Sequence, residues 1–182
     1  RNQGKHLATL AGNTAASLIK QVNPNERVKF VAELNGMLQE RGTTRVALQV
    51  LEKIGSSAVT SGPTIKSLTQ HEQDDVRLDA TAALWTITKD TETCLPILLN
   101  GLKSESTQAR NTARDTLIKT GGKLTRYKPQ VTELLNDAET TLSMLRILEQ
   151  IGVDAKPLTG AIEPLTKVDS RKTKYYATRA LK

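Results

Sequence analysis

A period of about 33 residues runs through the chain and limits its fold more than any other feature. Similar segments such as VLEKIG, TLIKTG and ILEQIG recur, each with a leucine shortly before a glycine. The leucines in register are Leu51, Leu84, Leu117, Leu148 and Leu181, and the intervals between them are 33, 33, 31 and 33 residues. A regular period of this length predicts stacked supersecondary units rather than one irregular core.

Other positions keep the same period and predict the structure of each unit. Four residues before the leucines stand Ala47, Ala80, Ala113, Met144 and Ala177. Four residues after the first four leucines, the pattern breaks at Gly55, Thr88, Gly121 and Gly152. Twelve residues after the first three leucines stand Pro63, Pro96 and Pro129. Small residues let helices approach, glycine ends a helix and proline is tolerated in a first turn, so each unit is predicted as helix A, a loop and helix B.

The segments after the breaks carry the apolar spacing of an amphipathic helix, as in LPILLNGL, KPQVTELL and GAIEPLTKV. The first 40 residues are predicted to form a looser unit, in which Ile19 takes the place of the repeat leucine. Its second helix is VKFVAELNGML, which either Asn23 or Asn25 would cap.

Together these patterns predict an all-α fold, a right-handed α-α superhelix of about four helical hairpins plus a terminal helix. Residues 1–182 would form a single repeat domain. Its units are approximately 1–40, 41–71, 72–104, 105–136, 137–168 and a partial 169–182. The chain starts at Arg1 rather than at methionine, which leaves open an upstream segment, a longer parent chain and the compartment, with the cytoplasm favoured.

The composition argues against several classes of function. Aromatic residues make up only 3% of the chain, too few for a module that stacks bases or sugars on aromatic side chains. One cysteine and two histidines supply neither a disulfide framework nor, without carboxylates, a four-ligand zinc site. No apolar run approaches the roughly 18 residues that a membrane span needs. We therefore expect no cofactor, no metal and no membrane partner.

One repeat resembles a known family. VRLDATAAL, followed by a break and LPILLNGL, resembles the short HEAT-like repeats found in phycobilin lyases, and ARNTARDTL in the next unit keeps the arginine and the spacing. Units one and four depart from this pattern, because Thr44 and Thr141 stand where the middle units have Arg77 and Arg110. The resemblance implies a HEAT-like solenoid in which these arginines bond to neighbouring loop carbonyls or acids. As a minor alternative, it also implies a subunit of a lyase-type or other enzyme assembly.

The residue types that could carry chemistry are more simply explained as structural. Trp85 and Cys94 have no histidine or acid in register with them, so we expect both to pack. HEAT-repeat deoxyhypusine hydroxylases bind iron through several His-Glu pairs, whereas this sequence has one, at His71 and Glu72. No phosphate-binding glycine loop or nucleophile motif is present. The chain is therefore predicted not to be an enzyme.

The positive charge is concentrated in the second half of the chain. The formal net charge is +7, and residues 110–128 and 167–182 each carry +5. Binding of nucleic acid or another polyanion is therefore an alternative function. Its candidate residues are Arg114, Lys119, Lys123, Arg126, Lys128, Lys172 and Lys174. The competing interpretation is that these side chains only keep the surface hydrated.

The favoured prediction is a non-catalytic scaffold that presents a concave helical-repeat surface to a protein or peptide and is monomeric in isolation. Because stacked repeats align equivalent positions, the residues nineteen after each repeat leucine are predicted to form a polar ladder on helix B. These residues are Gln70, Lys103, Asn136 and Lys167. The alternative is that these residues form only a solvated face.

Overall fold

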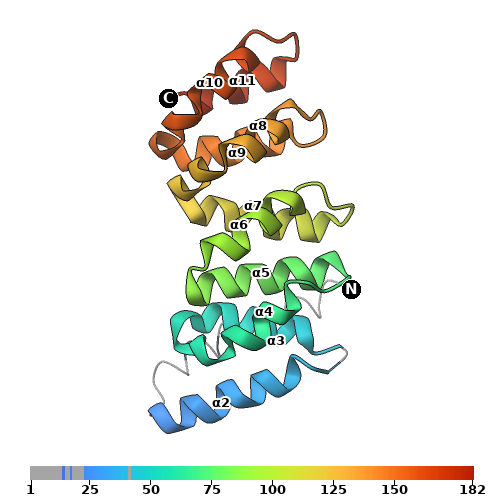
Figure 1. Ribbon diagram of the computed structural model, residues 1–182, viewed down its shortest axis with the longest axis vertical. Helices are drawn as coiled ribbons and strands as arrows, with labels where there is room; N and C mark the ends of the chain where they lie inside the picture. Colours follow the sequence, from blue (N-terminus) through green and yellow to red (C-terminus); the bar gives the residue numbers. More distant parts are fainter. Residues whose placement is uncertain (1–13, 15–16, 18–22, 41) are drawn as a thin grey trace. The chain divides into compact units, whose positions relative to one another are not determined.

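The computed structural model describes residues 14, 17, 23–40 and 42–182, and this part of the chain contains helices and no strand (Figure 1). The elements in order are α2 (Pro24–Met37), α3 (Thr44–Ile54), η1 (Gly55–Ser61), α4 (Gly62–Leu68), α5 (Asp74–Thr88), α6 (Thr91–Gly101), α7 (Thr107–Thr120), η2 (Gly121–Tyr127), α8 (Lys128–Asn136), α9 (Thr141–Ile151), η3 (Gly152–Leu158), α10 (Thr159–Ile162), η4 (Glu163–Thr166) and α11 (Arg171–Ala180). The elements marked η are 3-10 helices. As predicted, A helices alternate with B helices along the chain. The A helices are α3, α5, α7, α9 and α11, and the B helices are α4, α6, α8 and α10.

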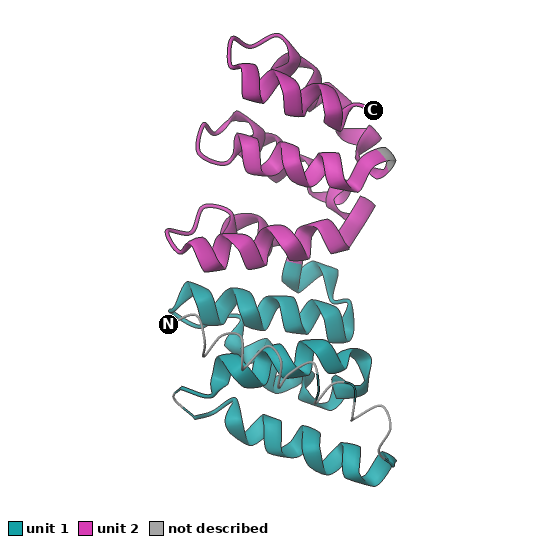
Figure 2. Ribbon diagram, turned by 180° about the vertical axis from the view of Figure 1, so that it is seen from behind, with its two compact units in different colours: residues 1–94 teal, residues 95–182 magenta. Residues whose placement is uncertain are grey.

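The chain divides into two compact units, Arg1–Cys94 and Leu95–Lys182, with the boundary inside α6 (Figure 2). In the first unit α3 packs on α5, and both η1 and α4 lie against α5. In the second unit α9 packs on α7 and α11, α8 packs on α9, and η2 packs on η3. The repeats therefore stack through their A helices within each unit.

The residues four before the repeat leucines, four alanines and one methionine, lie where helices meet. Ala47, Ala80, Ala113, Met144 and Ala177 are all fully buried. The repeat leucines before the last one are also buried, whereas Leu181 is 36% exposed just beyond the end of α11. The register read from the period is therefore confirmed in the core and fails at the last leucine.

Glycine ends three of the A helices, as predicted. Gly55, Gly121 and Gly152 have φ angles of 68°, 59° and 63°, in the left-handed region that glycine enters without a Cβ clash. A 3-10 segment begins at each of them, and Pro63 and Pro129 then stand in the first turns of α4 and α8. The predictions for these two prolines are confirmed.

The second repeat departs from this pattern. Thr88 is the last residue of α5, and Lys89 takes the left-handed conformation with φ 58°. Helix α6 then begins at Thr91 without an intervening 3-10 segment, so Pro96 lies inside the helix. The prediction that Pro96 occupies a first turn is therefore wrong. With threonine in place of glycine the turn is shorter, so α6 begins earlier in the sequence than predicted.

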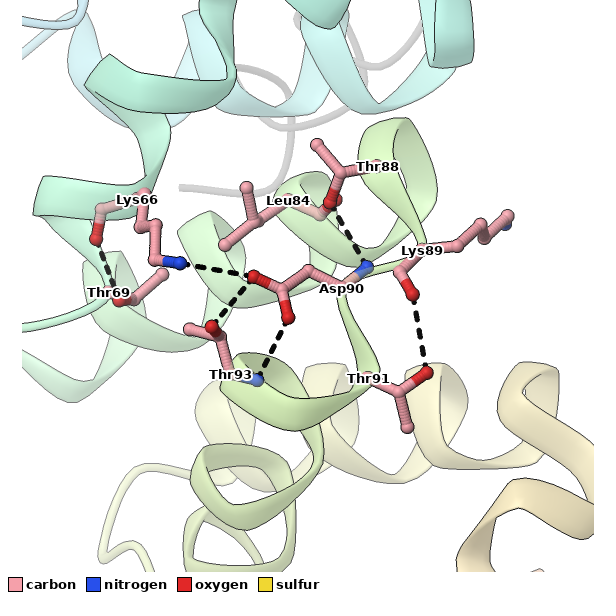
Figure 3. A network of polar contacts seen from close by, with 8 residues as sticks. All are labelled: Lys66, Thr69, Leu84, Thr88, Lys89, Asp90, Thr91 and Thr93. Carbon is pink, nitrogen blue, oxygen red and sulfur yellow. Dashed lines mark hydrogen bonds and ion pairs between the residues drawn. The ribbon is translucent and has the colours of Figure 1, made fainter.

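A polar network around Asp90 fixes this shortened turn (Figure 3). The Asp90 carboxylate accepts hydrogen bonds from the Thr93 hydroxyl at 2.7 Å and the Thr93 N–H at 3.0 Å, which caps α6. Lys66 Nζ lies 3.2 Å from the same carboxylate and ties α4 to the turn. These hydrogen bonds, those from Thr93 above all, lower the pKa of Asp90.

Trp85 and Cys94, on either side of this turn, are buried. Trp85 is 5% exposed, and the Lys89 ammonium lies 3.8 Å from its ring centroid. Burial raises the pKa of the Cys94 thiol to about 12, so the thiol is protonated at neutral pH. Since the thiolate is the reactive form, Cys94 has the properties of a packing residue.

The loops that lead from helix B to helix A close in two ways. In the middle repeats an arginine binds two loop carbonyls: Arg77 binds those of residues 71 and 72, and Arg110 those of residues 104 and 105. In the repeats that lack the arginine, Thr44 bonds to the carbonyls of residues 38 and 40, and Thr141 to those of residues 135 and 137. The expected role of the arginines is confirmed, and threonine replaces it where they are absent.

The first predicted unit is described only in part. Asn23 caps α2 by accepting a hydrogen bond from the Glu26 N–H at 3.0 Å, which decides between the two predicted caps. Ile19 lies outside the described residues. In the described part of the chain, none of the helices has both the length and the apolar character to cross a membrane.

Candidate functional site

A groove of the second unit crosses the A helices and has a volume of about 480 Å³. Arg114 and Ile118 line it from α7, and Arg146 and Glu149 line it from α9, which lies between α7 and α11 (Figure 1). The third helix, α11, contributes Tyr175, Tyr176 and Arg179. Three stacked repeats therefore each supply a guanidinium group to one surface.

Helical spacing explains why these side chains meet. Residues four apart lie on one face of a helix, as do Arg114 and Ile118, Arg146 and Gln150, and Tyr175 and Arg179. Between helices, Arg146 contacts Tyr176 and Glu149 contacts Arg179, and both pairs are 30 residues apart. The groove is thus a product of repeat stacking in the second unit.

The two tyrosines hold two of the arginines. Their rings meet edge to face, with centroids 5.2 Å apart and an interplanar angle of 83°. The guanidinium of Arg146 lies 4.8 Å from the Tyr176 ring centroid and donates a hydrogen bond to the Tyr176 hydroxyl at 3.1 Å. Arg179 lies over Tyr175 at 5.5 Å and donates to its hydroxyl at 3.0 Å. Cation–π contacts and hydrogen bonds thus act together to orient both guanidinium groups.

The three arginines differ in their carboxylate partners. Arg179 pairs with Glu149, and the hydrogen bond to Glu149 is the main cause that raises the pKa of Arg179. Arg114 pairs with the adjacent Asp115, at 2.8 Å between Nη2 and Oδ1. No carboxylate of the described residues pairs with Arg146, which is exposed. Arg146 is therefore the guanidinium of the groove whose charge an external anion can balance.

The predicted ladder residues Gln70, Lys103, Asn136 and Lys167 are exposed. They lie at the ends of the B helices rather than along their faces: Asn136 is the last residue of α8, and the other three lie in the turns after α4, α6 and η4. In the second unit, Lys103 Nζ binds Glu133 Oε1 at 2.7 Å, which raises the pKa of Lys103. Lys103 borders a cleft of about 110 Å³ with Asn100 and Glu133, much smaller than the groove on the A helices.

The predicted polyanion residues are exposed or half-buried, but they do not gather on one surface. Lys123, Arg126 and Lys128 lie in η2 and at the start of α8, where helix A turns into helix B. Lys172 and Lys174 lie in the first turn of α11, where helix B has turned into helix A. These two kinds of turn lie at opposite ends of the helices within the second unit (Figure 1). Lys119 lies in the last turn of α7, and Arg114 alone of the set lines the groove.

The His-Glu pair of the first unit lies beside a polar hollow of about 330 Å³ that Arg45 and Thr44 also line. His71 Nδ1 accepts a hydrogen bond from the Gln73 N–H at 3.1 Å, so one ring nitrogen is engaged in the loop. Within the described residues, no group of three or more histidine, cysteine, aspartate or glutamate side chains could hold a metal ion.

Sequence reasoning missed most of the groove. Arg146, Tyr175, Tyr176 and Arg179 were not among the candidate residues, although the segment KYYATR places two tyrosines and an arginine on adjoining helical faces. The contact between Arg146 and Tyr176 spans 30 residues, which is one repeat less about one helical turn, so the 33-residue period alone does not pair them.

No family model matches the chain, and no curated protein matches it. Solved structures do resemble it. An engineered protein from a structural genomics consortium has a TM-score of 0.59 and 17% identity, over 96% of this chain and 85% of the other. A designed armadillo repeat protein has a TM-score of 0.52 and 15% identity, over 95% and 91% of the two chains. A TOG-domain structure of crescerin has a TM-score of 0.41 and 15% identity, over 95% and 83%.

These likenesses concern the fold. They do not extend to the phycobilin lyase type of repeat, which stays a prediction. The all-helical structure and its armadillo-type neighbour agree with the period read from the sequence. The chain has the α-solenoid fold of HEAT- and armadillo-like helical repeat proteins.

Proposed function

We propose that the chain is a non-catalytic scaffold whose groove on α7, α9 and α11 receives a segment of a partner protein. Helical repeat folds of this kind are typically used for protein binding. The observation that carries the proposal is the gathering of arginine and tyrosine in one groove, in a chain with only 3% aromatic residues. Tyrosine and arginine are enriched among the residues that dominate protein interfaces.

The ladder residues offer a second surface for a protein partner. Their support is the repeat register and their exposure. In the second unit, however, Glu133 already binds Lys103, so a partner would have to displace or include that ion pair. We therefore favour the groove on the A helices over the ladder residues as the binding site for a partner protein.

Polyanion binding is the less favoured alternative. A polyanion needs a continuous series of cationic contacts along its backbone. Lys123 and Lys172, by contrast, lie on opposite ends of the helices in the second unit. Among the described residues, no group of three or more histidine, cysteine, aspartate or glutamate side chains could hold a metal ion and so support a metal-dependent enzyme.

The proposal is tested by selecting peptides from a random display library on the wild-type protein and measuring their affinity by fluorescence anisotropy. Tyr175 is 54% exposed in the groove, and Tyr175→Ala should weaken binding about tenfold or more, as for an interface hot spot. The matched control is Val59→Ala, which trims a 58% exposed apolar side chain in η1 and should leave affinity unchanged. Peptides that ignore Tyr175→Ala but lose affinity with Lys103→Glu would move the site to the ladder residues.

A further inference from the structure

The electrostatics of the groove specify the chemistry of its occupant, if the groove is a peptide site as proposed above. Three guanidinium groups, of Arg114, Arg146 and Arg179, face it. The carboxylates beside them, Glu149 and Asp115, pair with Arg179 and Arg114 respectively. One positive charge, that of Arg146 on the central helix, is left without an internal carboxylate among the described residues.

Arg146 is also held in position before any ligand arrives. The guanidinium carbon lies 4.8 Å from the Tyr176 ring centroid, the Tyr176 hydroxyl accepts a hydrogen bond from Nη2, and the Tyr175 ring packs edge to face on the Tyr176 ring. A guanidinium has five N–H donors, so the donors that Tyr176 does not engage remain available to bind a carboxylate. Because the side chain is already ordered, binding a carboxylate there loses less conformational entropy than binding by a mobile lysine.

Apolar surface lies next to this charge. Tyr175 is 54% exposed on α11, and Ile118 is half-buried on α7. A ligand that places a carboxylate on Arg146 would therefore cover apolar side chains with its neighbouring residues. This combination suits a peptide in which acidic and apolar residues alternate.

A single-stranded nucleic acid fits the same groove less well. Base stacking needs open aromatic faces, but Arg146 and Arg179 each lie over one of the two rings. The basic residues of η2, which a phosphate backbone would need as further contacts, lie away from the groove at the end of the helices.

We infer that the groove binds an acidic peptide segment, with a glutamate or aspartate carboxylate held by the guanidinium of Arg146 and apolar residues beside it against Tyr175 and Ile118.

The test uses three fluorescein-labelled probes in anisotropy titrations at about 150 mM salt. The first is a peptide of about 12 residues that alternates glutamate and leucine, which spans roughly 40 Å when extended. The second replaces every glutamate by glutamine, and the third is a single-stranded oligothymidylate of similar length. The glutamate peptide should bind about tenfold to a hundredfold more tightly than the glutamine peptide, because charge-assisted hydrogen bonds are the stronger kind.

Three variants assign the effect to the arginine. Arg146→Gln should weaken binding of the glutamate peptide to the level of the glutamine peptide, and Arg146→Lys should restore only part of it, since lysine lacks the fork of N–H donors that arginine has. Arg126→Gln, which removes the same charge from an exposed residue of η2, is the matched control and should change nothing. Thermal melts of all three variants should coincide with the wild type, because both arginines are exposed.

Each contrary result has a separate meaning. Equal affinity of the two peptides, or equal losses with Arg146→Gln and Arg126→Gln, would overturn the acidic-peptide inference. If display nevertheless selects peptides whose affinity depends on Tyr175, the proposed peptide-binding function still holds, but without the preference for acidic peptides. Tighter binding of the oligothymidylate than of the glutamate peptide would overturn the inference in favour of nucleic acid. Failure of both peptides to bind would also overturn it.

Discussion

The guanidinium of Arg45 on α3 binds the carboxylate of Asp79 on α5, with 2.9 Å between Nε and Oδ2. The Asp79 side chain is only 7% exposed, and Arg45 also reaches Asp75 at 3.2 Å through Nη1. These contacts join two successive A helices of the first unit beside the buried Ala47 and Ala80. The stacking of repeats therefore includes a nearly buried charge that needs its partner.

Arg45→Ala should lower the free energy of unfolding by about 1 to 3 kcal/mol, because the Asp79 carboxylate then loses the charge-assisted hydrogen bond that Arg45 donates to it. The control is Arg114→Ala, whose pair with Asp115 is far more exposed and should contribute about 0 to 1 kcal/mol. Urea unfolding of both variants measures the difference. Equal losses for the two would mean that the low exposure of Asp79 has no energetic consequence.

The cap of α6 makes stability depend on pH at acid values. Hydrogen bonds from Thr93 hold the pKa of Asp90 below its ordinary value, so the folded chain binds that proton more weakly than the unfolded chain. The stabilisation from the ionised carboxylate is therefore complete above the unfolded pKa of about 3.9, and it is lost as the pH falls through the folded pKa.

Asp90→Ala should accordingly cost about 1 kcal/mol at neutral pH, the usual effect of losing a helix N-cap. The difference from the wild type should shrink as the pH falls below about 4. Asp90→Asn, which keeps an oxygen that can cap the helix, should cost less at neutral pH. Chemical unfolding across the acid range checks this, and a constant difference for Asp90→Ala down to about pH 2 would contradict the assignment.

The repeat register predicts which alanines cannot be enlarged. Ala80 and Ala113 are fully buried where A helices pack, so leucine at either position should lower the free energy of unfolding by about 1 to 3 kcal/mol. Ala32→Leu, on an exposed position of α2, makes the same change without a tight neighbour and should be nearly neutral. Thermal melts of the three variants provide the measurement. Neutral melts for both buried positions would show that the tight helix contacts lie elsewhere.

Most of the fold could be predicted from the sequence because the repeat fixes both burial and helix ends. Ala47 and Gly55 stand at distances from Leu51 that recur in the other repeats. The alanine position allows close helix packing, and the glycine position allows a backbone with positive φ. Pro96 was placed wrongly because Thr88 and Asp90 allow a different, shorter turn. The choice between two turns depends on local hydrogen bonds that a period does not encode.

The groove was not predicted, for a related physical reason. A count of basic residues along the chain does not distinguish Lys123 from Arg146. Lys123 lies in η2 between two helices, whereas Arg146 lies on α9, the central A helix of the second unit. The contact between Arg146 and Tyr176 depends on how far one repeat is displaced along the next. That displacement is set by side-chain packing between A helices, so the structure was needed to find it.

Photo-crosslinking tests most directly whether the groove on the A helices is the binding surface. A display-selected peptide that carries a benzoylphenylalanine would be irradiated with the protein, and the attached residues would be mapped by mass spectrometry. We predict adducts around Gln150, Tyr175 and Ile118, which line the groove. Adducts confined to the ladder residues Gln70, Lys103, Asn136 and Lys167 would contradict it.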